Sequence, residues 1–232
     1  MSDAGGGGRP ESARVAFWST FSIGSTNFPN FNSQLTSANN YSAFGTYKNV
    51  SGFEFTNVTS TLAGTTVESL LANFDIISTG TGVNMSAADA AKVKEYVDRG
   101  GVALIMLDPA RGSELLTAFG GNGTVATGTI NGTSTTDDVN NGVFGDARDI
   151  ALTGVATSGR ITMSQLPTDN KLLANEATSN ARVWITGTNG RAIFFWDEGV
   201  FRAPAVAGTV VDTPQELFLH NVMAYALSRT AL

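Results

Sequence analysis

The most constraining feature of this sequence is the run VALIML at residues 102–107, in which apolar side chains follow one another without a polar break. A strand with one face in water alternates apolar and polar residues, whereas a strand covered on both faces does not. The run lies between Gly100-Gly101 and Asp108-Pro109, which mark its two ends. It is far shorter than the roughly 20 residues that cross a bilayer. We therefore interpret it as the central strand of a sheet with helices on both sides.

The rest of the chain alternates strand-like and helix-like segments, which is the pattern of an α/β domain. The other predicted strands are 14–20, 53–59, 75–80, 160–166, 171–177, 181–187 and 191–199. Helices are predicted at 31–38, 65–74, 86–99, 113–119 and 213–227. The tripeptide TNG at 188–190 predicts a hairpin between the last two strands. Residues 120–149 are poor in large apolar side chains, so a loop-rich excursion or hairpin at the rim of the sheet is expected there.

Two helices carry complete start or stop signals. Ser86, with Asp89 three residues later, begins one helix, and Gly100-Gly101 ends it. The sequence TPQE at 213–216 combines a cap, a helix-starting proline and a capping-box glutamate. The predicted fold class is α/β: a three-layer sandwich with a mostly parallel central sheet, helices on both faces and an antiparallel hairpin near the C-terminus. One domain over residues 13–232 is the economical interpretation.

Composition excludes several classes of function. The formal net charge is −6, and both nucleic acid and anionic membranes need clustered Lys and Arg, so neither is an expected partner. The sequence has no cysteine, which excludes disulfides, thiolate metal sites and cysteine nucleophiles. Its single histidine, His220, excludes a His-rich zinc site and leaves only carboxylate-type metal chemistry. No transmembrane segment is expected.

Residues 1–12 begin MSDAGGGGRP and are predicted to form a flexible Gly-rich tether. The tether is either an expression remnant or disordered end, or the start of a mature lipoprotein in which Met1 replaces the lipidated cysteine. Ser, Thr, Asn and Gly are abundant and Lys is scarce, which fits an exported protein. Sequons such as Asn57-Val58-Thr59 permit glycosylation. We therefore expect an extracytoplasmic location, in the periplasm or at the cell surface, with a lipid anchor as one alternative.

Residues 74–108, FDIISTGTGVNMSAADAAKVKEYVDRGGVALIMLD, resemble the class I glutamine amidotransferase-like superfamily. In that superfamily a strand, a helix ending near a Gly-Gly pair and a central strand lead to the nucleophile turn. The segment GRAIFFWDEGVF at 190–201, followed by a capped helix with Asn221, looks like the end of its non-catalytic branches. These include trehalose-utilisation-like and gliding or flagellar-transport-like domains. The resemblance covers most of residues 14–227 and implies a flavodoxin-like fold.

The chain departs from the catalytic members of that superfamily at the residues that perform chemistry. The enzymes need a cysteine in the turn after the central strand, activated by a histidine beside an acid. Here the turn begins with Asp108-Pro109, and the strand expected to deliver the histidine delivers Trp196, Asp197 and Glu198. Amidotransferase and cysteine-peptidase activity are therefore excluded, and the resemblance implies a non-catalytic branch.

Candidate ligand-binding residues follow the predicted strands, because ligands of open α/β sheets bind outside the carboxyl ends of the strands. They are Thr79, Thr81, Asp108, Asp197 and Glu198, with Trp18 and Trp196 as rings that suit sugar faces. No metal site is predicted outright, although carboxylates of this kind could hold Ca²⁺ or Mg²⁺. Two of them roughly 5 to 9.5 Å apart would suit glycoside hydrolysis.

A purely structural role for these acids is the alternative that we favour. Asp108 is then expected to cap the helix that follows it, and Asp197 to cap a helix or to pair with Arg111 or Arg202. The run TGTG at 79–82 lacks the lysine of a P-loop and the third glycine of a dinucleotide motif, so a tight turn is expected rather than an anion cradle. The run DDVNNG at 137–142 has Val139 where a calcium loop needs an oxygen ligand, and we expect a polar loop. His220 is expected to be a packed or half-exposed neutral imidazole.

These observations predict a non-catalytic binding or assembly module with a protein or glycan partner and no cofactor. The alternative is a carbohydrate-active or divalent-metal-dependent hydrolase that uses the rim carboxylates. The sequence does not predict an oligomeric state.

Overall fold

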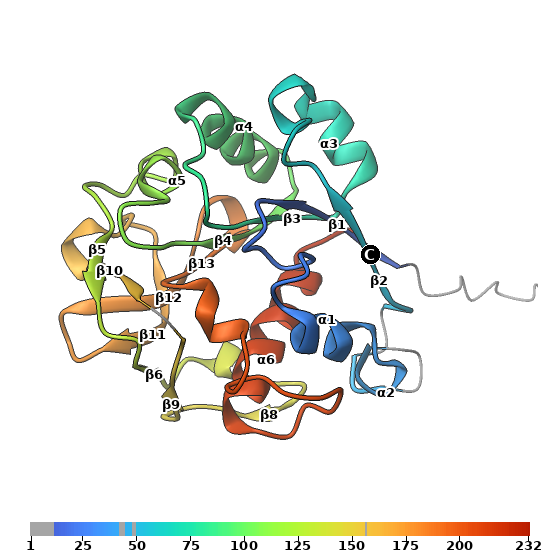
Figure 1. The fold of residues 1–232 in the computed structure, drawn as a ribbon, viewed down its shortest axis with the longest axis vertical. Coiled ribbons are helices and arrows are strands. Elements are labelled where there is room, and N and C mark those ends of the chain that lie inside the picture. Colours follow the sequence, from blue (N-terminus) through green and yellow to red (C-terminus); the bar gives the residue numbers. More distant parts are fainter. Residues whose placement is uncertain (1–11, 42–44, 48–49, 156) are drawn as a thin grey trace, which may run out of the picture.

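A large mixed sheet forms the centre of the molecule (Figure 1). The computed structural model describes residues 12–41, 45–47, 50–155 and 157–232, so all of the predicted tether except Ser12 lies outside the described residues. One half of the sheet is parallel, in the order β2 (Phe53–Asn57), β1 (Ala13–Trp18), β3 (Ile76–Thr79), β4 (Val102–Met106) and β13 (Ala192–Phe195). This is the 2-1-3-4-5 strand order of flavodoxin-like folds. The predicted α/β fold with a mostly parallel sheet is confirmed.

Strand β4 lies at the centre of the parallel half, between β3 and β13. All of its residues are buried, because helices cover both faces of the sheet at this position. Its register places Met106 beside Phe195 of β13, so the two strands end at the same level. The residues that follow them therefore emerge together at the carboxyl edge of the sheet.

The other half of the sheet is antiparallel and larger than the sequence predicts. It continues from β13 through β12 (Asn180–Thr186), β11 (Lys171–Glu176), β6 (Gly132–Ser134) and β9 (Ala151–Leu152). Strand β10 (Ser158–Thr162) pairs with β12 and with β5 (Ala126–Gly128), and β7 (Asn141–Gly142) forms a small hairpin with β8 (Gly145–Asp146). The predicted hairpin between β12 and β13 is confirmed, and its loop contains the 3₁₀ turn η4 (Thr188–Gly190).

Helices cover both faces of the sheet, as Figure 1 shows. Helices α3 (Val67–Asn73), α4 (Ala87–Asp98) and α5 (Ser113–Ala118) pack on one face, with the 3₁₀ turn η1 (Leu62–Gly64). Helices α1 (Pro29–Thr36), α2 (Ala38–Tyr41) and α6 (Pro214–Ser228) pack on the other, with η2 (Asp138–Asn140) beside α6. Each face has its own buried apolar cluster. The predicted starts of α4 and α6 are confirmed: Ser86 accepts from the Asp89 amide, and a capping box begins α6.

Two predicted strands are too long, and in both cases a side chain starts a 3₁₀ turn. The segment predicted at 160–166 leaves the sheet after Thr162, which forms a capping box with Gln165 at the start of η3 (Met163–Gln165). The segment predicted at 191–199 ends at Phe195, because Asp197 caps η5 (Glu198–Phe201). Within the described residues, no helix combines the length and hydrophobicity needed to span a membrane.

Candidate functional site

Three carboxyl groups converge at the carboxyl edge of the sheet. Asp108 follows β4, and Asp197 and Glu198 follow β13, so the parallel register of these strands brings them together. Their ligand oxygens all lie within 4.8 Å of one another. Asp197 and Glu198 are buried, and Asp108 keeps 19% of its side chain exposed, which gives solvent access to the cluster. Among the described residues, this is the only group of three or more potential metal ligands that lie so close together. We call these three residues the acidic cluster.

A tight turn after β4 positions Asp108. The Arg111 amide donates to the Asp108 carbonyl at 2.8 Å, and Arg111 Nη1 lies 3.3 Å from Asp108 Oδ2. The expectation that Asp108 caps the next helix is wrong, because Gly112, with φ 86°, occupies the N-cap position of α5. Asp108 lies too early in the turn to reach the first amides of that helix. Its side chain instead lies beside the carboxyl groups of Asp197 and Glu198 and pairs with Arg111.

The tip of the same turn is a residue that the sequence did not single out. Ala110 is exposed and has φ 60°, a left-handed conformation that is rarely adopted without glycine. A strained residue between a buried strand and a helix is the position that carries the nucleophile in nucleophile-elbow enzymes. The methyl group of Ala110 has no nucleophilic atom. Only the backbone angle marks this position, so the sequence had no signal for it.

Each of the two buried acids has one oxygen without a hydrogen-bond partner. Asp197 Oδ1 accepts from the Gly199 amide at 2.6 Å, which is the predicted capping role, while Oδ2 has no partner. Glu198 Oε2 is also buried without a partner, and the Thr81 hydroxyl interacts with the Glu198 carboxyl. Buried polar atoms are nearly always hydrogen-bonded, so two unpartnered oxygens in one cluster are unusual.

Burial and mutual repulsion shift the titration of the cluster. Burial raises the pKa of Asp197 to about 8, with the neighbouring Glu198 carboxyl adding to the rise and the Gly199 amide opposing it. Burial also raises the pKa of Glu198, and Asp108 adds to that rise while Thr81 and Arg202 oppose it. The pKa of Asp108 is raised by burial and held down in part by Arg111. Burial and mutual repulsion therefore oppose full ionisation of the three carboxyl groups.

The TGTG turn supports the cluster and does not form an anion cradle. The Thr81 carbonyl accepts a hydrogen bond from Ser19 Oγ at the end of β1, and Thr81 is 2% exposed. At Gly80, an added Cβ would clash with the backbone carbonyl of Phe21, so these two backbone segments approach too closely for any side chain at position 80. Thr79 is fully buried, and its hydroxyl has no partner. The tight-turn interpretation of 79–82 therefore agrees with the structure.

Both candidate sugar-binding tryptophans are buried instead of lying at the surface. Trp18 is 6% exposed and packs in the core beneath α3 and α4, and Trp196 is fully buried on the opposite face of the sheet. The Arg182 guanidinium lies 5.8 Å from the centre of the Trp196 ring. Neither indole offers a face to a sugar in solution.

His220 is fully buried in the core and is held there by neighbouring side chains. Tyr41 Oη and Gln34 Oε1 each lie 2.7 Å from one of its ring nitrogens, and Phe31 stacks on the ring. Gln34 uses its amide nitrogen to donate to Glu216, so its oxygen must accept from His220 Nε2. His220 Nδ1 then accepts from the Tyr41 hydroxyl. The predicted neutral, packed imidazole agrees with this arrangement.

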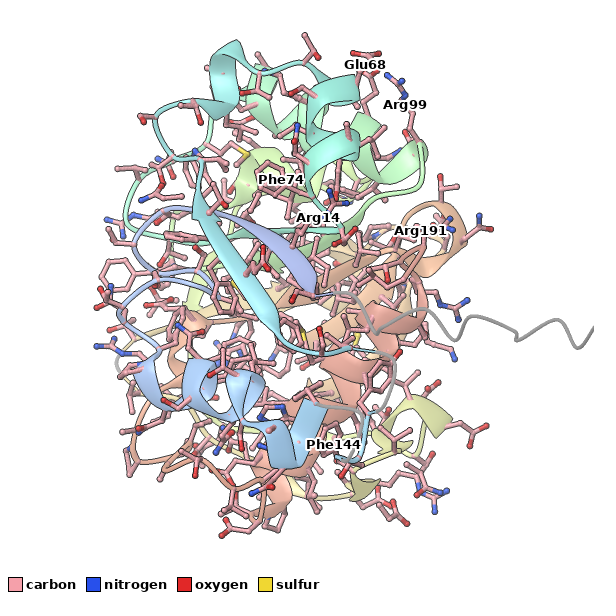
Figure 2. The ribbon with its side chains drawn as sticks, turned by 90° about the vertical axis from the view of Figure 1, so that its right-hand side faces the viewer. Arg14, Glu68, Phe74, Arg99, Phe144 and Arg191 are labelled. Carbon is pink, nitrogen blue, oxygen red and sulfur yellow. The ribbon has the colours of Figure 1, made fainter. Side chains whose placement is uncertain are left out.

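At the amino edge of the sheet, acidic side chains are paired with arginines. Figure 2 shows Arg14, Arg99 and Arg191, which precede or begin the parallel strands. Acids at that edge are paired: Arg14 Nη2 lies 2.8 Å from Asp75 Oδ1, and Arg99 pairs with Glu68. The three acids at the carboxyl edge instead lie close to one another, although Asp108 also pairs with Arg111, so the clustering there is not a general property of this acidic protein.

Comparison with known proteins identifies the scaffold. No family model matches the sequence, and no curated protein matches it. A solved structure of a ThuA-like protein from Bacteroides uniformis superposes with a TM-score of 0.58 and 12% identity, over 100% of this chain and 97% of that chain. The chain therefore shares the flavodoxin-like α/β fold of this ThuA-like protein.

A second solved structure has a similar fold across most of the chain. The N-terminal domain of mmIFT52 has a TM-score of 0.58 and 12% identity, over 95% of this chain and 99% of that chain. The exo-β-1,4-mannosidase Op5Man5 from an Opitutaceae bacterium matches at a TM-score of 0.49 and 13% identity, over 81% of this chain and 31% of that chain, which is too low to carry an argument. At these identities the likeness shows the fold and not the activity.

Proposed function

We propose that this chain is a non-catalytic binding module that uses the carboxyl edge of an amidotransferase-like scaffold to hold a ligand. The acidic cluster provides the ligand-binding groups, with Thr81 supporting Glu198. The tip of the turn after β4 carries no cysteine or hydroxyl nucleophile, because Ala110 occupies it and the sequence lacks cysteine. His220 is held in the core by Tyr41 and Gln34, so it is not available as a base.

One observation carries this proposal: Asp197 and Glu198 bury oxygens that have no partner, beside a third carboxyl group. Burying an unpartnered polar atom destabilises a fold by about 1–3 kcal/mol, and like charges at short range add to that cost. A cluster that destabilises the empty fold is expected where function requires it. A purely structural cluster should instead be satisfied internally, as Asp75 is by Arg14.

The stability of an Asp197→Asn variant tests the proposal. The amide keeps an oxygen for the Gly199 amide and gains N–H groups that can donate to the neighbouring carboxyls, so repulsion becomes hydrogen bonding. We expect the free energy of unfolding, measured by urea titration in EDTA, to rise by roughly 1 kcal/mol or more. As the matched control, Asp75→Asn should lower it, because Asp75 accepts three hydrogen bonds from Arg14. If Asp197→Asn destabilises the fold as Asp75→Asn does, the acids are structural and the proposal fails.

The carbohydrate-hydrolase alternative is not favoured by the geometry. The carboxyl pairs of glycosidases flank a sugar at separations of roughly 5 to 9.5 Å. Here the oxygens approach within 4.8 Å, and both tryptophans are buried. A protein or glycan partner, and an extracytoplasmic location with or without a lipid anchor, remain part of the proposal. Their support is the resemblance and the Thr- and Asn-rich, Lys-poor composition.

A further inference from the structure

The spacing of the acidic cluster matches one class of ligand. Calcium binds oxygen ligands at 2.3–2.6 Å, so two of its ligands on opposite sides lie up to about 5 Å apart. Magnesium binds at 2.0–2.1 Å, keeps several waters and usually takes only one or two carboxylates. Three carboxyl oxygens within 4.8 Å of one another lie within the span of calcium's ligands, and three carboxylates exceed the one or two that magnesium usually takes. The cluster contains only oxygen ligands, which disfavours zinc and copper.

The two unpartnered oxygens provide an observation independent of the clustering. Asp197 is 1% exposed and is anchored by the bond from Gly199 to Oδ1, which leaves Oδ2 unpartnered. Glu198 is 8% exposed, and its Oε2 is unpartnered. A carboxylate that is held by one oxygen and keeps the other free is oriented in advance for a metal ion. The bond from the Gly199 amide therefore supports Asp197 as a ligand.

The arginines near the acidic cluster, Arg111 and Arg202, do not block a cation from binding. Arg111 Nη1 approaches Asp108 Oδ2 at 3.3 Å, but its side chain is 42% exposed. Arg202 is also partly exposed. Arg111 can move into solvent when an ion arrives, because an ion pair with an exposed cation contributes little to stability.

We infer that Asp108, Asp197 and Glu198 form a calcium-binding site at the carboxyl edge of the sheet. This inference rests on the proposed function and names its ligand. Asp108, as the partly exposed member, lies where the ion enters, and Asp197 and Glu198 provide the buried ligands, of which Asp197 is anchored by the Gly199 amide. Water completes the coordination sphere, because three carboxylates supply fewer oxygens than the 6–8 that calcium takes.

Titration of the full chain with calcium tests the site. Protein treated with EDTA and dialysed should bind one Ca²⁺ in isothermal titration up to about 10 mM, which exceeds the 10⁻⁴–10⁻³ M range of extracellular calcium modules. Magnesium should bind at least tenfold more weakly. Asp197→Asn and Glu198→Gln should each weaken calcium binding at least tenfold, with circular dichroism confirming the fold. Arg111→Gln should strengthen it several-fold, because it removes the competing cation. The control Asp146→Asn, in an exposed pair with Arg148, should bind calcium as the unmodified chain does.

Each alternative outcome has a definite meaning. No saturable calcium binding, or unchanged binding in both cluster variants, overturns the inference. Magnesium binding as tight as calcium binding overturns the choice of ion. If Asp197→Asn stabilises the empty fold but calcium does not bind, the proposed function stands and the calcium inference falls. If Asp197→Asn destabilises the empty fold, the proposed function itself fails.

Discussion

The buried imidazole of His220 should make the folded protein sensitive to acid. The ring is fully buried, stacks on Phe31 and accepts a hydrogen bond from the Tyr41 hydroxyl at Nδ1, so a second ring proton would force that hydroxyl to turn its own proton away. Burial lowers the pKa of His220 to about 3, and the nearby Glu216 carboxylate opposes this only in part. An unfolded chain has a histidine pKa near 6.5.

The sign and size of the effect follow from this difference in pKa. Between about pH 6.5 and pH 3 the unfolded state binds a proton that the folded state does not. The free energy of unfolding therefore falls as the pH drops through this window. The limiting slope is about 1.4 kcal/mol per pH unit. A change from about pH 6.5 to pH 5 thus removes about 2 kcal/mol of stability through this residue alone.

A His220→Gln variant isolates the contribution, because the glutamine cannot titrate. We expect the variant to be less stable than the unmodified chain by about 1–3 kcal/mol near pH 8, where the Tyr41 hydroxyl loses its acceptor. That difference should shrink by about 2 kcal/mol near pH 5, since only the unmodified chain is penalised by acid. Urea unfolding followed by the fluorescence of the buried tryptophans Trp184 and Trp196 measures both values.

A second measurement uses the fact that His220 is the only histidine of the chain. Its ring proton signals in NMR should show no titration above about pH 4. The reasoning is refuted if the stability difference between the two proteins stays constant from about pH 8 to pH 5, or if the ring titrates near 6.5.

Two further substitutions test the buried polar networks. Although burial alone would raise its pKa, Glu216 has a pKa of about 2 because backbone amides and a side-chain amide donate to it. Glu216→Gln should lower stability by about 2 kcal/mol near neutral pH, and the deficit should shrink below about pH 4, where the carboxylate takes up a proton in the unfolded chain but not yet in the folded one. A deficit that does not change with pH would contradict this. Arg182 is fully buried and donates to Glu176, to the Gly159 carbonyl and to two other oxygens. Arg182→Lys should therefore lower the free energy of unfolding by about 2–4 kcal/mol in urea titration. As the control, Arg148→Lys, in an exposed pair, should change it by less than about 1 kcal/mol. Equal effects of the two arginine substitutions would show that the buried network contributes little.

The acidic cluster combines a successful prediction with a wrong one. The sequence placed Asp108, Asp197 and Glu198 at strand ends, and the parallel register of β4 and β13 brings them within 4.8 Å. The capping role expected for Asp108 was wrong, because the turn at Ala110 and Gly112 delays the start of α5. A left-handed alanine leaves no mark in a sequence, since its conformation is imposed by the surrounding fold.

The sequence by itself determined the features that depend on neighbours along the chain. The apolar run of β4, the Ser86 cap and the capping box before α6 are set by periodicity and by hydrogen bonds over three or four residues, and all three agree with the structure. The absence of cysteine likewise determined which chemistry the scaffold lacks.

Only the tertiary structure decided which side chains are buried, which are paired and which are left without a partner. Trp18 and Trp196 follow strand patterns that fit either a surface or a core, and the packing of helices on both faces placed them in the core. The partners of His220 are Tyr41 and Gln34, some 180 residues away along the chain. Burial, pairing and pKa depend on distances between segments that are remote in sequence, and these distances exist only once the sheet has formed.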